Sequence, residues 1–343
     1  MYIPGKNFTL TLKPTEAVAG TMTVNGVAIL SQGFTMAFPY VSDALNFYLG
    51  TNLRLPIATF GTFVALAILI AARITTHEVT RLQGSGAFDR PSSGAASFLP
   101  SDTIGKLTVV AVLAGMLGAK LFDAIERADE LLSDPLGVLF STGGFSIYGG
   151  LLVGGAAGAL LVRRQSISLV PMLDSFAPAL ALGYAIGRLG CQFSGDGDWG
   201  KQAAMELKPT WLPDWWWAQT YDNNVLGIVI PNPGVYPTPL YEAFASFALF
   251  LLLWSFRKRL KTPGVPFSLY LIFSGLQRLL IEKIRINIEY SIFGIEITQA
   301  QLISIALIIV GSIGILKISQ FSHFSRMLFS MFILGTLTAC TVL

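Results

Sequence analysis

The chain has few charged residues for its length. Asp, Glu, Lys and Arg make up 13% of its 343 residues, whereas hydrophobic residues make up 53%. Soluble domains carry about 25% charged residues, so this composition excludes an ordinary soluble protein and indicates a polytopic membrane protein. The formal net charge of +3 is too small to support binding to nucleic acid.

Cysteine and histidine are also scarce, with two residues of each. Cys191 and Cys340 lie far apart, in a pattern unlike a disulfide framework or a zinc site. His77 and His323 fall in segments that we expect on the cytoplasmic side. The first fifty residues lack the basic stretch and short apolar core of a cleaved signal peptide. With so few cysteines and histidines, we expect neither a bound metal ion nor a cofactor.

Long apolar stretches dominate the chain instead. A spanning helix needs about 20 mostly apolar residues. Seven segments fit this requirement: 55–74, 104–126, 145–162, 170–190, 239–256, 266–284 and 299–317. The sequence therefore predicts an all-α polytopic membrane protein with a bundle of seven transmembrane helices. The apolar run 327–343 is a candidate eighth helix of marginal length.

Three parts follow one another along the chain. We expect an N-terminal interfacial segment over 1–54, a transmembrane domain over 55–320 and an apolar tail over 321–343. In the first part, Asn25-Gly26 between short apolar runs predicts a small β-hairpin at the membrane surface. Within the second part, 191–238 is a long polar and aromatic loop.

Basic residues in short loops set the orientation of a membrane protein. They are concentrated after the first, third, fifth and seventh spans: Arg73, Arg81, Arg90, Lys106, Arg163, Arg164, Arg257, Lys258, Arg259, Lys261, Lys317 and Arg326. The intervening loops hold few. This alternation predicts that the N-terminus and the loop 191–238 lie on the periplasmic or extracellular side.

Arg188 stands near the outer end of the fourth span. A guanidinium cannot shed its charge and is costly in hydrocarbon, so it must face a partner, a water-filled cavity or an anionic ligand. Gly195, Asp196 and Asp198 follow closely. This run of glycine and carboxylate indicates a site rather than a simple helix exit.

The sixth span carries more charge. Arg278 and Glu282 are spaced i, i+4 and share a helix face, and Arg285 lies close to the same face. A structural ion pair accounts for one arginine and one carboxylate, but it does not explain three arginines near one membrane face. Guanidiniums bind phosphate bidentately. Because a phospholipid headgroup is the phosphate available there, the pattern predicts a headgroup site.

Polar groups also mark the starts of two other spans. Tyr148, Gly149 and Gly150 begin the third span, where the alternative to a site is a packing face of small residues. Tyr236 and Glu242 flank the start of the fifth span. There the alternative is a capped helix start, with proline and an acidic residue in the first turn.

Six short motifs occur in order between about residues 105 and 315. They are Ser133-Asp134-Pro135, Phe145 through Leu151, Asp174 through Pro178, Gly187-Arg188-Leu189-Gly190 with Gly195, Asp196, Trp199 and Gly200, Tyr236 through Glu242, and Arg278 through Arg285. Together they resemble the prolipoprotein diacylglyceryl transferase family. Any one motif is weak, but six in order are specific.

The resemblance implies a seven-span protein of the bacterial inner membrane, multi-pass, with its N-terminus in the periplasm. It implies transfer of the diacylglyceryl group of phosphatidylglycerol to the thiol of a lipobox cysteine in a prelipoprotein, with a thioether and glycerol phosphate as products. The implied partners are phosphatidylglycerol, the prelipoprotein signal peptide and the lipid bilayer. We expect a monomer and no nucleic acid.

The chain departs from the usual family pattern at its polar motifs. Tyr148 stands where many members have histidine. Asp196 and Asp198 compete for the position of the family's glutamate. Cys191 and Gln192 likewise compete for the position of its asparagine. These changes leave the identity of the general base open.

We expect Arg188 and Arg278 to neutralise the departing phosphate, with Glu282 beside Arg278 and Tyr148 as the positional candidate for the base. Arg285 should lie closer to the rim. The expected substrate-binding residues are Arg285, Gly149, Gly150, Cys191, Gln192, Gly195, Asp196, Asp198, Tyr236 and Glu242.

Asp196, Asp198 and Glu242 should mainly orient arginines and loop backbone. For Cys191, a packing role is favoured over that of an acyl-accepting nucleophile.

Two other functions compete with this interpretation. Intramembrane arginines also mark ion pathways, so a transporter with an anion-binding site is one alternative. The chain shows no internal repeat of the kind found in many transporters. The second alternative is a diverged paralogue that keeps the phospholipid site and uses another acceptor, because a fold does not determine a function.

Overall fold

The structure is a computed structural model that describes residues 36–88, 98–141, 144–287, 289–292 and 295–317. The hairpin expected at Asn25-Gly26 and the apolar run 327–343 lie outside the described residues.

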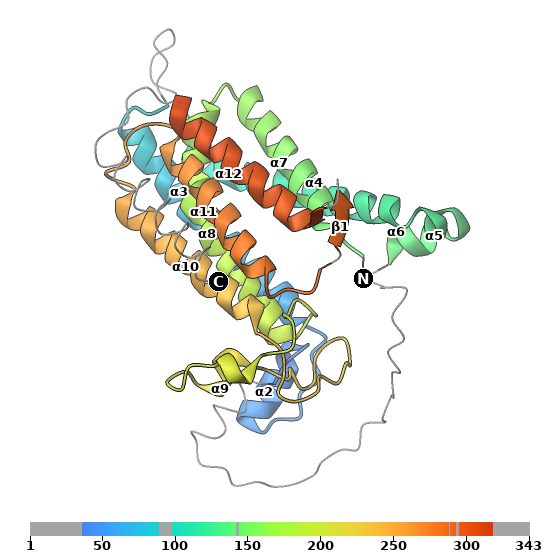
Figure 1. Cartoon of the computed structure of the whole chain (residues 1–343). Coiled ribbons are helices and arrows are strands. Elements are labelled where there is room, and N and C mark those ends of the chain that lie inside the picture. The colour runs from blue at the N-terminus through green and yellow to red at the C-terminus, as the bar shows by residue number, and fades with distance from the viewer. Residues whose placement is uncertain (1–35, 89–97, 142–143, 288, 293–294, 318–343) are drawn as a thin grey trace.

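Long helices dominate the described chain and pack side by side (Figure 1). A helix occupies each of the seven expected positions. The α-helices are α2 (Val41–Leu49), α3 (Thr59–Gly84), α4 (Pro100–Glu126), α5 (Ala128–Ser133), α6 (Pro135–Phe140), α7 (Ile147–Arg164), α8 (Leu169–Ser194), α9 (Asp214–Trp217), α10 (Thr238–Phe256), α11 (Val265–Glu282) and α12 (Gln299–Lys317). A 3₁₀ turn covers Met205–Leu207.

Five of these helices, α3, α4, α8, α10 and α12, are long and apolar enough to cross a membrane. Helices α7 and α11 also occupy expected spans, but each has only 18 residues and carries charges near its end. Those charges lower the mean hydropathy of α7 and α11. The described residues therefore show a polytopic helical membrane protein, while seven spans remains a prediction.

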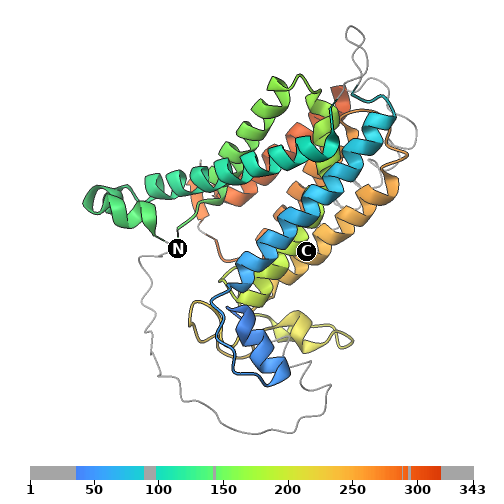
Figure 2. The same ribbon diagram turned by 180° about the vertical axis from the view of Figure 1, so that it is seen from behind.

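Helix pairs build the bundle. Helix α8 packs between α3 and α10, α4 packs against α7, and α11 packs against α12. Figure 2, from behind, shows α3 running beside α8. The pairing of α4 with α7 depends on glycine, because a Cβ on Gly149 would lie 2.2 Å from the backbone oxygen of Gly118. Gly150 also faces α4. Both glycines therefore pack against α4, as expected for a packing face of small residues.

Residues 36–58 and 195–237 form one compact part, which we call the head, at the lower end of the bundle in Figure 1. The backbone N–H of Ala37 donates to Asp222 at 2.7 Å. Gly195 ends α8 with a φ of +63°, a conformation that favours glycine. A Cβ there would lie 2.7 Å from the Cβ of Ala37. Residues 36–58 therefore pack on the loop that follows α8.

A short antiparallel hairpin connects α11 to α12. Strands β1 (Glu289–Ile292) and β2 (Ile295–Thr298) pair with Glu289 opposite Thr298. Our sequence analysis missed this hairpin, although its apolar and polar residues alternate as in a strand. It brings Thr298 back to the end of α11, where the candidate site lies.

Candidate active site

The candidate site lies where α8 ends and α10 begins. Helix α8 carries Arg188, and α11 carries Arg278 near its own end. Helix α10 begins at Thr238 with proline in its first turn, which sets the chain direction there. The hydroxyl of Thr238 donates to the backbone oxygen of Asp198 at 2.7 Å. This bond joins the loop after α8 to the start of α10.

Glu242 is the centre of the site. Its side chain is 0% exposed, and three arginines surround it. The distances from its carboxylate are 2.5 Å to Arg188 Nη2, 2.9 Å to Arg278 Nη1 and 3.5 Å to Arg285 Nη1. The hydroxyl of Tyr184 donates to the same carboxylate at 3.1 Å. Glu242 therefore orients the arginines, as expected, and is more than a helix-capping residue.

Asp198 joins two of the same arginines. It forms ion pairs with Arg188 and with Arg285, the latter at 2.8 Å. Burial alone would raise the pKa of Asp198, but the two guanidiniums outweigh burial and lower that pKa to about 2. Asp196 instead accepts a hydrogen bond from the backbone of Asp198 at 3.3 Å. Burial and the charge of Asp198 raise the pKa of Asp196. Of the two carboxylates, Asp198 is thus the one that binds arginine.

Glu282 connects the site to the hairpin. Its carboxylate lies 3.3 Å from Arg278 Nη2, which confirms the ion pair expected from the i, i+4 spacing. It also accepts hydrogen bonds from the side chains of Asn287 and Thr298, each at 2.6 Å. Sequence reasoning missed these two partners, because nothing in the pattern placed the hairpin beside α11.

The arginines are grouped as predicted, but they are not free cations. Glu242, Asp198 and Glu282 supply one carboxylate for each guanidinium, so the cluster is formally neutral. The Arg278 side chain is the most open, at 24% exposed. The side chain of Arg285 is 9% exposed, so our expectation that it lies closer to the rim is wrong. An antiparallel β-bridge between the backbones of Arg285 and Gly200 holds this residue against the loop that follows α8.

Tyr148 lies in the first turn of α7. It interacts electrostatically with Arg278 and Glu282. Within the described residues its hydroxyl makes no hydrogen bond. The start of α7 is held by Ser146, whose hydroxyl donates to Glu126 at 2.9 Å. The structure therefore brings Tyr148 to the cluster without attaching it to an arginine.

The other expected substrate contacts divide into two groups. Cys191 is buried beside Arg188, with 3.6 Å between Sγ and Nη1. Gln192 points into the head, where it donates to Gln219 at 2.6 Å. Tyr236 also belongs to the head, because its hydroxyl accepts from the backbone of Ala204 at 3.1 Å. Only Cys191 of this set touches an arginine; Gln192, Gly195 and Tyr236 stabilise the head.

One group of side chains has the composition of a metal site. Ligand atoms of Cys191, Asp196 and Asp198 lie within 4.8 Å of one another. Both oxygens of Asp198, however, are occupied by Arg188 and Arg285. A divalent cation placed there would be repelled by two fixed positive charges, so these residues do not fit a metal ion.

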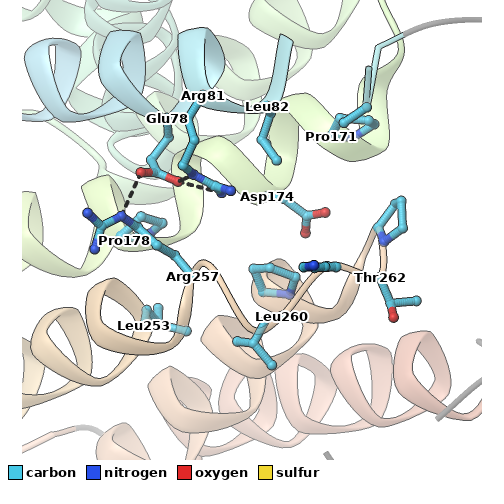
Figure 3. A pocket seen from close by; sticks show the side chains of 14 residues that line it. Glu78, Arg81, Leu82, Pro171, Asp174, Pro178, Leu253, Arg257, Leu260 and Thr262 are labelled. Atoms are coloured by element: carbon cyan, nitrogen blue, oxygen red, sulfur yellow. Dashed lines mark hydrogen bonds and ion pairs between the residues drawn. The ribbon is translucent and has the colours of Figure 1, made fainter. Parts of the chain in front are cut away.

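A second charged cluster lies at the opposite end of α3 and α10. It borders an open recess with about 440 Å³ of empty space, mouth included (Figure 3). Buried Glu78 pairs with Arg81 at 2.7 Å and with Arg257 at 3.0 Å. Asp174 accepts the backbone N–H of Gly264 at 2.6 Å and thereby caps the start of α11. The ion pairs of Glu78 connect the end of α3 to the end of α10, and Asp174 connects α8 to the start of α11.

The fold and the cluster define a polytopic membrane protein with an arginine–carboxylate site where several helices end. The family model for prolipoprotein diacylglyceryl transferase matches residues 49–317, and the chain belongs to this family.

Two similar proteins are both phosphatidylglycerol–prolipoprotein diacylglyceryl transferases. The one from Finegoldia magna is 34% identical over 220 residues, which cover 63% of this chain and 78% of that protein. The one from Bacillus cereus is 27% identical over 262 residues, which cover 76% of this chain and 87% of that protein. The resemblance identified from the motifs is thus confirmed.

Proposed function

We propose that this chain transfers the diacylglyceryl group of phosphatidylglycerol to the lipobox cysteine thiol of prelipoproteins, the first step of lipoprotein maturation. Family membership over 49–317 and the activity named for the similar proteins support this function. The observation that carries it is the meeting of Arg188, Arg278 and Arg285 at one buried carboxylate.

The reaction forms one bond and breaks one. The sulfur of the lipobox thiol bonds to the glyceryl carbon that carries the phosphate, and the carbon–oxygen bond to that phosphate breaks. Glycerol phosphate leaves with the electron pair, and the thiol proton passes to a base or to water. Negative charge grows on the phosphate in the transition state, where fixed guanidiniums stabilise it most.

Different arginines are suited to different tasks. Arg278 is the most exposed of the three, so we assign it the first contact with phosphate. Arg285 has buried Nε and Nη1 atoms without a hydrogen bond among the described residues. Because both atoms are enclosed and Nη1 lies 3.5 Å from the Glu242 carboxylate, Arg285 acts on the phosphate through its charge rather than by a direct hydrogen bond. Every side-chain nitrogen of Arg188 has a partner, so Arg188 acts from a fixed position.

The base is assigned by position. Only the thiolate attacks well. Tyr148 interacts electrostatically with Arg278, and its hydroxyl makes no hydrogen bond among the described residues. We propose that Tyr148 acts as its phenolate, which the charge of Arg278 favours, and takes the thiol proton to become the neutral phenol. The alternative is that Tyr148 only positions the lipid and the exposed Arg278 guanidinium favours the thiolate.

The orientation follows from the two ends of the bundle. We propose that the head and the arginine cluster face the periplasm in the bacterial inner membrane. Basic residues Arg81, Arg257 and Lys261 border the recess at the opposite end, as positive-inside topology requires. Phosphatidylglycerol and the prelipoprotein would then both reach the cluster from the outer leaflet.

Lipidation of a lipobox peptide tests the function directly. The full chain is reconstituted into vesicles containing phosphatidylglycerol, or into vesicles of phosphatidylethanolamine alone. We expect mass spectrometry to show a diacylglyceryl adduct on the peptide cysteine only with phosphatidylglycerol, together with released glycerol phosphate. A peptide with serine in place of that cysteine should stay unmodified. No adduct in any vesicle, combined with anion flux across the membrane, would instead favour the transporter.

A further inference from the structure

Tyr184 stands one turn before Arg188 on α8, and the proposed function does not use it. Its hydroxyl accepts a hydrogen bond from Arg188 Nε at 3.1 Å and donates one to Glu242 Oε1 at 3.1 Å. A tyrosine hydroxyl can do both at once. The guanidinium carbon of Arg188 also lies 5.4 Å from the centre of the Tyr184 ring. Tyr184 therefore touches both charged groups at the centre of the site.

The two parts of this side chain have different surroundings. Tyr184 is 41% exposed, yet its hydroxyl bonds to Glu242, which is fully enclosed. The ring thus forms an outer wall of the cluster, and the hydroxyl points inward. On a helix that is apolar enough to cross the membrane, the exposed ring suits lipid and the hydroxyl requires the polar partners that it has.

Three contacts hold the Arg188 guanidinium, one at each of its side-chain nitrogens. Arg188 Nη1 reaches Asp198 and Nη2 reaches Glu242, but both carboxylates are also shared with Arg285. Neither pair alone therefore fixes Arg188. The bond from Nε to the Tyr184 hydroxyl holds the near end of the fork. Without it, Nε is left buried without a partner, which is unfavourable.

We propose that Tyr184 is a positioning residue for the transfer reaction. Its hydroxyl holds the side chains of Arg188 and Glu242 in a fixed relative orientation, so that Arg188 faces the charge that develops on the departing phosphate. This inference rests on the proposed function. Arg278 makes the first contact with phosphate in that scheme, so loss of the hydroxyl should slow turnover more than it weakens lipid binding.

Three variants of the full chain in phosphatidylglycerol vesicles test this role. Tyr184→Phe removes the hydroxyl and keeps the ring, whereas Tyr184→Gln loses the ring and keeps one donor and one acceptor. Tyr270→Phe is the matched control, because it removes a hydroxyl that bonds to Ser274 on α11. The measurements are kcat and KM for phosphatidylglycerol with a lipobox peptide, and the melting temperature of each variant.

We expect kcat of Tyr184→Phe to fall by about tenfold to a hundredfold, while KM changes less than about threefold. Tyr184→Gln should keep a higher kcat than Tyr184→Phe, and Tyr270→Phe should stay within about twofold of wild type. A structural role for the ring predicts the reverse order, with Phe above Gln. That order, or a wild-type kcat in Tyr184→Phe, overturns the inference. Lack of transfer by the wild-type chain overturns the proposed function instead.

Discussion

Glu242 and Arg278 form an ion pair of 2.9 Å between the first turns of α10 and the last turns of α11. The glutamate is fully enclosed, while the arginine keeps an open side. The same carboxylate reaches Arg188 on α8. One buried anion therefore fixes three helix ends against one another and presents one of its cations toward the exterior.

Removal of the Glu242 carboxylate should damage both stability and activity. Loss of one partner of a buried ion pair costs about 3–5 kcal/mol, because the remaining charge is uncompensated. For Glu242→Ala we expect a clearly lower melting temperature in detergent and lipidation reduced by at least about a hundredfold. Glu206→Ala, an exposed carboxylate in the head, is the control. A Glu242→Ala protein that melts and turns over like wild type would contradict the central role of this carboxylate.

Arg278 should not be replaceable by lysine. A guanidinium offers a planar fork that holds a carboxylate and a phosphate oxygen together, whereas an ammonium is a point charge. We expect Arg278→Lys to lower kcat/KM by about tenfold or more, with a raised KM for phosphatidylglycerol. Exposed Arg163→Lys at the end of α7 is the control. Wild-type kinetics in Arg278→Lys would exclude bidentate phosphate contact.

Asp198 should contribute stability with a defined pH dependence. Its pKa of about 2 in the folded chain lies below its ordinary value of 3.8, so its ionised form favours the folded state. That contribution is complete above pH about 4 and is lost as the pH falls toward 2. We expect Asp198→Asn to melt below wild type at neutral pH, with a difference that shrinks on acidification. A difference that is constant or grows below pH about 4 would contradict the assignment. Exposed Asp129→Asn is the control.

The sequence predicted local features of the site well. The spacing of Arg278 and Glu282 on one helix face required no tertiary information, and the ion pair is present. The same holds for Arg188, since a buried guanidinium on an apolar helix requires a partner. Six of the seven helices likewise begin and end near the expected residues, because hydrophobic length determines them. Helix α3 is the exception, because it continues to Gly84 although the apolar stretch was expected to end at 74.

The sequence did not predict which partners meet. Glu242 was expected to orient arginines, but the sequence did not say which ones, because its three arginines come from separate segments. Tyr184 gave a weaker signal that could have been used: it lies at i−4 from Arg188 and so shares its face. Asn287 and Thr298 reach Glu282 only through the hairpin. Long-range pairing of this kind is not encoded in any local period.

Tyr148→Phe tests the assignment of the base. If Tyr148 accepts the thiol proton, removal of its hydroxyl should lower kcat by about a hundredfold, within the range for general base catalysis. KM for phosphatidylglycerol should change little. The measurement is lipidation of a lipobox peptide across a pH series, because a peptide with a more acidic thiol should recover part of the loss. Activity near wild type in Tyr148→Phe would remove Tyr148 as the base.

Glu78→Gln tests whether a charge far from the candidate site affects stability without affecting activity. The cluster that contains Glu78 lies at the other end of α3 and α10. The Glu78 side chain is 2% exposed and forms ion pairs with Arg81 and Arg257. Glu78→Gln should therefore destabilise the fold by about 3–5 kcal/mol. Since neither arginine approaches the candidate site, kcat per folded molecule should stay within about twofold of wild type.

Thermal melting measures the loss of stability, and lipidation corrected for the fraction of folded protein measures kcat. Exposed Glu130→Gln is the control. A strong fall in kcat of the folded Glu78→Gln protein would mean that the two ends of the bundle are coupled. The structure offers a route for such coupling along α10, which carries Glu242 in its first turns and ends just before Arg257. Unchanged kcat with lowered stability would assign the second cluster to holding the helices together.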